Sequence, residues 1–178
     1  MNTVRWRIPN KKDRGLLQSF SCAQGVSPKG EPLPWEHEVQ TYFRREALAD
    51  TNRSLRHDQR FRIAEDAQGL AAAYTHARPV EWHPDLHIPS GHACRYLLMI
   101  AVALRHRHQG GKFADEVLIN ALYDIVEREP DHDSVAVLAR IDYRNVPSQN
   151  MFRRTGFEEV IPGAPTSRLG WWLLTLER

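Results

Sequence analysis

The stretch that decides the fold is Leu104-Arg-His-Arg-His-Gln-Gly-Gly-Lys-Phe-Ala114. An unbroken apolar run, residues 97–104, leads into it, and a segment with helical periodicity, residues 111–129, follows it. A buried strand that passes through a glycine-containing loop into a helix leaves the first N–H groups of that helix without partners. With cations beside them, such N–H groups suit a pyrophosphate, because a helix N-terminus carries partial positive charge.

The segments around this stretch predict an α+β arrangement. Apolar periodicity predicts helices at 10–20, from Pro34 to about Leu48, at 111–129 and after Asn145. Alternation and apolar runs predict strands at 4–9, 60–64, 70–74, 95–104, 135–141, 157–161 and 170–176, and loops at 23–34 and 50–59. The strand at 95–104 is expected at the centre of the sheet, because consecutive apolar residues indicate burial on both faces.

Composition sets broad limits on function. A chain of 178 residues with 42% hydrophobic residues is expected to form one domain with a substantial core. Its formal charge of +2 does not by itself indicate binding to nucleic acid or membrane. Cys22 and Cys94 lack the spacing of a metal site and are expected to be reduced thiols. With no recognisable targeting segment and no long apolar run, a cytoplasmic location is expected.

A second informative stretch is Asn145-Val-Pro-Ser-Gln-Asn-Met-Phe-Arg-Arg-Thr-Gly-Phe157. Asn145 is expected to cap a helix, Pro147 fits the first turn, and Gly156 can supply the left-handed residue after the last turn. Taken in order, the two stretches resemble the acyl-CoA-binding motifs of the GNAT N-acetyltransferase superfamily. The likeness covers roughly residues 60–161.

In the first motif, Gln109 matches the position where the family has Gln or Arg, and Ala114 matches the final small residue. Lys112 stands where the family usually has glycine. A shifted alignment that starts at Arg107 loses the final small residue, so the first alignment is preferred. In the second motif, Ser148 replaces the usual Ala and Arg154 the usual Lys.

The resemblance implies one GNAT domain over residues 1–178, with a mixed, twisted sheet and helices on both faces. Residues 1–59 would form the acceptor side, and residues 60–178 the acyl-CoA-binding core and a C-terminal hairpin. It implies that acetyl-CoA or another acyl-CoA is the co-substrate, with no metal. The residues expected to bind it are Val102, Ala103, Leu104, Gln109, Gly110, Gly111, Lys112, Phe113, Ala114, Asn145, Ser148, Phe152 and Arg154.

The chain departs from the family at the usual general acid, a tyrosine, because position 152 is Phe. Phe152 is expected to pack beside the thiol, and Tyr143, Ser148 or water would protonate the leaving thiolate. The central strand has no carboxylate, so Glu81 is the preferred general base. Glu65 and Asp66 remain rivals for that role.

Several other polar and aromatic residues have two interpretations. The nine histidines are expected on the surface, although His83, His87 and His92 could line an acceptor pocket. Arg105, Arg107 and Lys112 form either a solvated face or contacts to the 3′-phosphate of the coenzyme. Trp171 and Trp172 are expected in the core or at a dimer edge, with an acceptor role as the alternative.

The function that the resemblance implies is transfer of an acyl group, typically acetyl, from acyl-CoA to a primary amine without a covalent intermediate. The amine would belong to a small molecule or a peptide, and a homodimer is possible. Three alternatives stay open. They are a toxin-like enzyme acting on aminoacyl-tRNA, an acyl-CoA sensor with weak catalysis, and an interaction module that no longer binds the coenzyme.

Overall fold

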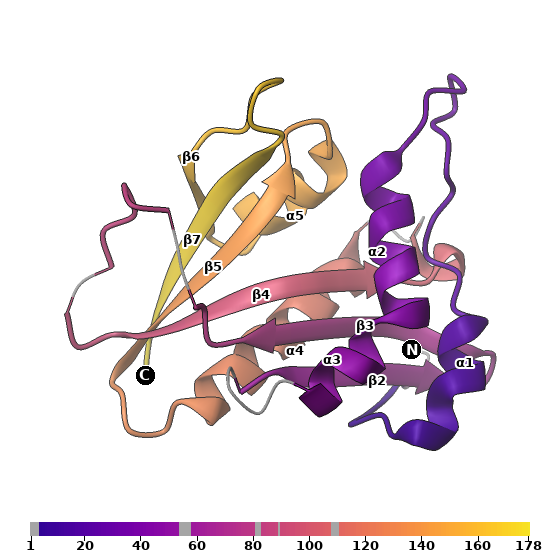
Figure 1. The fold of residues 1–178 in the computed structure, drawn as a ribbon, viewed down its shortest axis with the longest axis horizontal. Helices are drawn as coiled ribbons and strands as arrows, with labels where there is room; N and C mark the ends of the chain where they lie inside the picture. The colour runs from indigo at the N-terminus through magenta and orange to yellow at the C-terminus, as the bar shows by residue number, and fades with distance from the viewer. Residues whose placement is uncertain (1–3, 54–57, 81–82, 89, 108–110) are drawn as a thin grey trace.

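Seven strands form one mixed sheet in the order β1-β2-β3-β4-β5-β7-β6 (Figure 1). The computed structural model describes residues 4–178 except 54–57, 81–82, 89 and 108–110. The pairing of β4 with β5 is parallel, whereas the other pairings between described strands are antiparallel. The strands are β1 Arg5–Arg7, β2 Arg60–Asp66, β3 Gly69–Ala77, β4 Ala93–Val102, β5 Ser134–Asp142, β6 Glu158–Ile161 and β7 Leu169–Glu177.

Helices cover both faces of this sheet (Figure 1). On the face toward the viewer, here called the front face, lie α1 Arg14–Gln18, α2 Pro34–Arg45 and α3 Ala47–Arg53. On the rear face lie α4 Lys112–Arg128 and α5 Val146–Arg154. Two short 3₁₀ turns, Lys11–Asp13 and Leu104–His106, complete the set of described helical segments.

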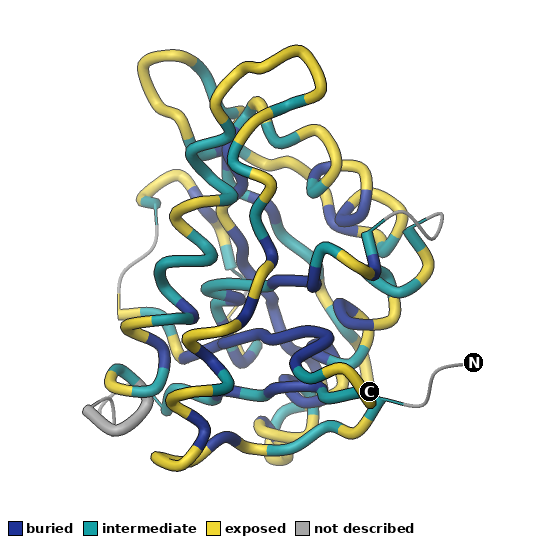
Figure 2. The backbone as a smooth tube through the Cα atoms, turned by 90° about the vertical axis from the view of Figure 1, so that its right-hand side faces the viewer, coloured by how far each residue is buried: buried dark blue, intermediate teal, exposed yellow. Residues whose placement is uncertain are grey.

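The core is divided between these two faces. The rear cluster joins α4 residues at helical spacing, such as Val117, Leu118 and Ile125, to the β5 residues Val137 and Ala139. The front cluster packs the apolar stripe of α1 and α2 onto β2 and β3 and contains Leu17, Phe20, Phe43, Phe61 and Ile63. Figure 2 shows buried positions running along the strands between the more exposed helices and loops. Burial on both faces therefore places β3, β4 and β5 at the centre.

The two parallel strands separate halfway along their length. Pairing runs from Ala93 opposite Val135 to Leu97 opposite Ala139 and then stops. The β3–β4 register shifts at the same place, because Met99 pairs with Thr75 but Leu97 pairs with His76. Leu98 is therefore the extra residue of a β-bulge, which bends β4. We call the diverging part, β4 residues 98–102 and β5 residues 140–142, the fork.

The sequence predicts the class of fold and most of the elements correctly. Several element boundaries differ by a few residues, among them the following two. The loop expected at 50–59 begins later, because α3 continues to Arg53. The central strand, expected at 95–104, runs from Ala93 to Val102, and Leu104 starts a 3₁₀ turn instead.

In the part of the chain that the structure describes, no helix has both the length and the apolar character needed to cross a membrane.

Candidate active site

The fork exposes backbone groups of β4. Ala103 donates its N–H to the carbonyl of Ala71 on β3, at 2.8 Å. Peptide groups alternate in direction along an antiparallel strand, so the N–H and C=O groups of Val102 and Ile100 point away from β3. They face the gap where β5 no longer pairs with β4. An extended ligand arm entering the fork would find these groups available, much as an added strand would.

The backbone groups of Ala103 and Leu104 have partners within the protein. The Leu104 N–H donates to the carbonyl of Ser21 at 3.0 Å. The carbonyls of Ala103 and Leu104 accept from His106 and Arg107, at 2.9 and 3.1 Å. Val102, Ala103 and Leu104 are all expected to bind the coenzyme, and of these three Val102 is the one whose peptide group is directed into the fork.

The N-terminus of α4 lies beyond the fork, after Gly111. Gly111 has a φ of 79° and no side chain that could cap the helix. The first N–H bond into the helix is made by Asp115, which donates to the Gly111 carbonyl at 3.0 Å. The N–H groups of Lys112, Phe113 and Ala114 therefore stand at the open end of a helix of 17 residues. Such an end attracts anions.

Arg154 connects the second sequence motif to this helix end. A Cβ atom placed on Gly111 would lie 3.1 Å from Nη2 of Arg154, so the guanidinium is in contact with the glycine. The same nitrogen donates to Oδ1 of Asp115 at 2.7 Å. About half of the Arg154 side chain stays exposed. The fold thus brings the two motifs together at one surface, formed by the N–H groups of the helix end and the Arg154–Asp115 ion pair.

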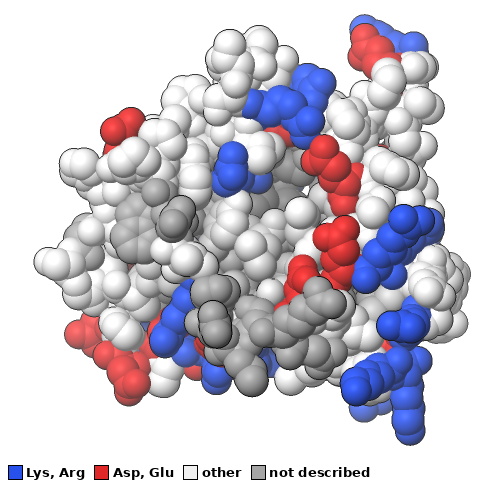
Figure 3. Space-filling model, in the orientation of Figure 1, with Lys and Arg blue, Asp and Glu red and all other residues white. Residues whose placement is uncertain are grey.

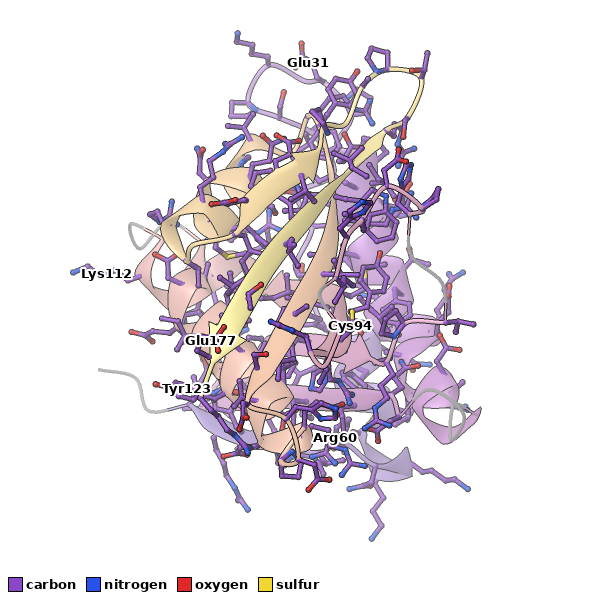
Figure 4. All side chains as sticks on the ribbon, turned by 90° about the vertical axis from the view of Figure 1, so that its left-hand side faces the viewer. Glu31, Arg60, Cys94, Lys112, Tyr123 and Glu177 are labelled. Carbon is purple, nitrogen blue, oxygen red and sulfur yellow. The ribbon has the colours of Figure 1, made fainter. Side chains whose placement is uncertain are left out.

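Lys112, which stands where the family usually has glycine, does not cover this surface. It is exposed, and its side chain extends away from the body of the molecule (Figure 4). The side chains of Phe113 and Ala114 instead pack against the rear core. Gln109 and Gly110, which were expected to bind the coenzyme, lie outside the described residues.

Residues 105–107, which follow β4, are fixed by ion pairs to neighbouring elements. His106 and Arg105 both bind Asp66 at the end of β2, at 2.7 and 2.8 Å. Burial raises the pKa of Asp66, but these hydrogen bonds outweigh it and lower that pKa to about 2. Arg107 binds Glu36 on α2 and the carbonyl of Cys22. Arg105 and Arg107 therefore anchor the segment through carboxylates of this chain.

The end of β5 and the start of α5 hold the candidate acids. The Asn145 side chain accepts a hydrogen bond from the Ser148 N–H at 3.3 Å and so caps α5. Ser148 and Tyr143 are both partly exposed beside the fork. The neighbouring Asp142 is buried and accepts hydrogen bonds from Arg144 and Arg168. The Arg144 hydrogen bond lowers the pKa of Asp142, which therefore makes a poor base.

Phe152 belongs to the rear core and is only 3% exposed. Its ring centroid lies 4.6 Å from that of Phe157 and 6.4 Å from that of Trp172. Trp172 is fully buried, as a core residue should be, whereas Trp171 is partly exposed on the front face.

Of the three candidate general bases, the two that the structure describes are engaged in ion pairs. Glu81 lies outside the described residues. Its rivals are engaged elsewhere, since Glu65 binds Arg7 and Asp66 binds Arg105 and His106. Of the histidines that could line an acceptor pocket, His83 has its ring 6.3 Å from Trp171.

The front face is hollowed between the β5–β7 side and the α2 side (Figure 3). Basic side chains border this hollow above and to the left in that view, and acidic ones on the right. Arg140 of β5 faces this side, next to Trp171, and the sequence motifs do not point to it. Only the pairing of β5 with β7 could have revealed the contact between these two residues.

Among the described residues, no group of three or more His, Cys, Asp or Glu side chains is arranged to hold a metal ion.

Comparison with known proteins supports the fold. Neither family models nor curated protein sequences match the chain. Solved structures do match over almost their whole length. One is a protein from Desulfovibrio desulfuricans assigned to the GNAT family of acetyltransferases, at 16% identity and a TM-score of 0.59, covering 98% of this chain and 99% of that one.

Two other matches were solved with a coenzyme bound. The PaiA N-acetyltransferase from Thermoplasma acidophilum, in complex with coenzyme A, is 11% identical with a TM-score of 0.62, and 99% of each chain is covered. AtaTR bound with acetyl-CoA is 12% identical with a TM-score of 0.64, with 97% of this chain and 94% of that one covered. At these identities the likeness shows a shared fold.

Proposed function

Because the chain has the GNAT fold, we propose that it is an N-acyltransferase that moves an acetyl or other acyl group from acyl-CoA to a primary amine. The observation that carries this proposal is the fork. Two central strands separate after Leu97 and Ala139 and open beside the uncapped N-terminus of α4. Coenzyme A or acetyl-CoA is bound in two of the structures that share this fold.

In this proposal the acyl-CoA spans both features. The pyrophosphate binds the N–H groups of Gly111, Lys112, Phe113 and Ala114, with Gln109, Gly110 and Arg154 beside it. The pantetheine arm lies in the fork against Val102, and Ala103 and Leu104 border the end of the arm that is nearer the pyrophosphate. Asn145, Ser148 and Phe152 border the thioester end. This placement of the pyrophosphate depends on Gly111, because a side chain at that position would occupy the space in front of the Arg154 guanidinium.

The acceptor would approach from the front, where residues 1–59 form one wall. Its neutral amine attacks the thioester carbonyl, a C–N bond forms, and the C–S bond breaks. The amine loses one proton and the departing thiolate gains one. Holding both reactants in place supplies much of the acceleration, up to about 7–11 kcal/mol in favourable cases. Glu81 is the proposed base, and Tyr143 or Ser148 the proposed acid.

A toxin-like action on aminoacyl-tRNA is the second candidate, because matches with this fold include AtaT, a toxin bound to its antitoxin, AtaR. A surface that binds RNA neutralises many phosphates with Lys and Arg, and the formal charge of this chain is only +2. In the described part of the chain, Arg105, Arg107, Arg144 and Arg168 are each paired with a carboxylate. We therefore favour an acceptor that is a small molecule or a peptide.

The test is a transfer assay with acetyl-CoA and a panel of amines, following free thiol and identifying acetylated product by mass spectrometry. The proposal predicts product with at least one amine and no mass increase of the enzyme itself, as direct transfer requires. Direct transfer would be contradicted by an acetylated enzyme that, once separated from acetyl-CoA, passes its acetyl group to the amine. Failure to bind acetyl-CoA would contradict the function as a whole.

The two candidate acids are separated by single variants. Tyr143→Phe or Ser148→Ala, whichever removes the acid, should lower kcat by about 10²–10⁴-fold. The other variant should keep the wild-type kcat. If both variants keep the wild-type kcat, water protonates the thiolate.

A further inference from the structure

Arg140 occupies a particular place in the fork. It is the first residue of β5 beyond Ala139, the last that pairs with β4. Ala139 and Ile141 point to the rear core, so Arg140 between them points to the front. The side chain is exposed. A cation therefore stands where the strands part, on the face opposite the helix end that would bind the coenzyme pyrophosphate.

Aromatic rings hold this cation. Trp171 is the β7 partner of Arg140, and the guanidinium carbon lies 5.1 Å from the centre of its ring. Tyr96 pairs with Leu138, two residues before Arg140 on the same face, and its ring is 6.0 Å from that of Trp171. Its hydroxyl also interacts with Arg140. A guanidinium that lies over a ring uses its face and keeps N–H donors at its edge.

Arg140 differs from the other arginines at this end of β5 in whether a carboxylate neutralises its charge. Arg144 and Arg168 both bind Asp142, and Arg168 also binds Glu38. For Arg140, no ion pair is formed with any carboxylate that the structure describes. The fold thus neutralises two neighbouring cations and presents the third, supported by two aromatic rings, on the front face.

We propose that Arg140, supported by Trp171 and Tyr96, binds a carboxylate of the acceptor, so that the acceptor is an amino-acid-like amine carrying its own carboxylate. This inference rests on the proposed acyl transfer. One planar guanidinium edge matches a carboxylate through two parallel hydrogen bonds. The rings supply an apolar wall for the rest of the acceptor. A polycationic acceptor would be repelled by the same residue.

The test compares matched acceptors. Each of the twenty amino acids and its carboxamide is assayed with acetyl-CoA, and kcat/KM is measured for wild type and for Arg140→Gln. Wild type should prefer the acid over the amide. Arg140→Gln should lose about 10- to 100-fold in kcat/KM for the acid, mainly through KM, and little for the amide, since a charged hydrogen bond contributes about 1.5–3 kcal/mol. Arg140→Lys should restore only part of the loss.

A matched control is available on the other face. Arg153 lies over Trp172 at 5.0 Å, in the same kind of stack but toward the rear. Arg153→Gln should leave the ratio of acid to amide unchanged. In calorimetry, Arg140→Gln, Arg140→Lys and Arg153→Gln should all bind acetyl-CoA with the wild-type affinity. A failure of this inference can then be distinguished from a failure of the proposed function.

A binding measurement covers the case in which no amino acid in the panel is acetylated. The indole N–H signal of Trp171 is followed by NMR while N-acetylglycine or N-acetylglycinamide is added in the presence of CoA. Saturable shifts with the acid alone, lost in Arg140→Gln, support the proposal. Equal response to acid and amide, no response to either, or an Arg140→Gln variant that keeps the preference would overturn it. If acetyl-CoA itself fails to bind, the proposed function fails first.

Discussion

At the scale of single residues, Gly111 links the fold to the proposed chemistry. Its φ of 79° is a conformation that side chains rarely adopt, and a Cβ there would lie 3.1 Å from the Arg154 guanidinium. Gly30 has nearly the same φ, 80°, but a Cβ on it would meet nothing within 4 Å. The two glycines share the backbone requirement, and only Gly111 lies at the helix end. A comparison of the two separates backbone strain from ligand binding.

We predict that Gly111→Ala and Gly30→Ala each lower the free energy of unfolding by about 1 kcal/mol, because both replace a glycine at positive φ. Only Gly111→Ala should weaken acetyl-CoA binding, by roughly tenfold or more, because the methyl group displaces Arg154 and narrows the approach to the amides. Denaturant unfolding and calorimetry measure the two effects. Equal affinities for the two variants would show that the coenzyme does not approach Gly111.

At the scale of elements, a buried arginine connects β4 to the C-terminal end of α4 and to the segment before β2. Arg95 on β4 is fully buried and donates from Nη1 to Asp58 and to Glu129, both at 2.8 Å. Arg128 on α4 binds the same Asp58 from an exposed position. The network lies on the half of β4 that pairs with β5, where Arg95 is opposite Val137.

We expect Arg95→Met to lower the free energy of unfolding by about 3–5 kcal/mol, because it removes the buried cation that the carboxylates of Asp58 and Glu129 share. Arg128→Gln, which removes an exposed partner of the same Asp58, should cost less than about 1 kcal/mol. Both are read from urea unfolding curves. If both variants lowered the free energy of unfolding by a similar small amount, the buried ion pairs of Arg95 would contribute little to stability.

At the scale of the whole molecule, acid stability reports on the ion pairs that anchor the loop before α4. The pKa of Asp66 is lowered to about 2 from an ordinary value of 3.8. Between these pH values the unfolded chain binds a proton that the folded chain does not, so stability falls as the pH falls. The contribution is fully present above about pH 4 and is lost on passing through pH 2.

Asp66→Asn should therefore reduce the midpoint of thermal unfolding by several degrees at pH 7 and flatten its dependence on pH between 4 and 2. Asp131→Asn, at an exposed position, serves as the control and should change neither. Calorimetric melts across this pH range supply the comparison. An Asp66→Asn slope equal to that of wild type would remove Asp66 from the acid transition.

The sequence predicts the architecture well because the central strand, α4 and α5 are specified by local periodicity and by residues at helix ends such as Asn145 and Gly156. It predicts the site less completely. The ion pairs of Arg105 and Arg107 with Asp66 and Glu36 join residues at least 39 positions apart, and no local pattern encodes such pairs. The contact of Arg140 with Trp171 likewise depends on which strands become neighbours. The general base proposed from the sequence, Glu81, stays a prediction.

The central claim is that acyl-CoA binds across the fork and the N-terminus of α4, and calorimetry with acetyl-CoA tests it most directly. Wild type should bind in the micromolar range, and Lys112→Glu should weaken binding by about tenfold, because it places a negative charge at the helix end that receives the pyrophosphate. Lys29→Glu, an exposed charge reversal in the loop before α2, should bind as wild type does. Absence of binding by wild type, or equal affinity in both variants, would contradict the claim.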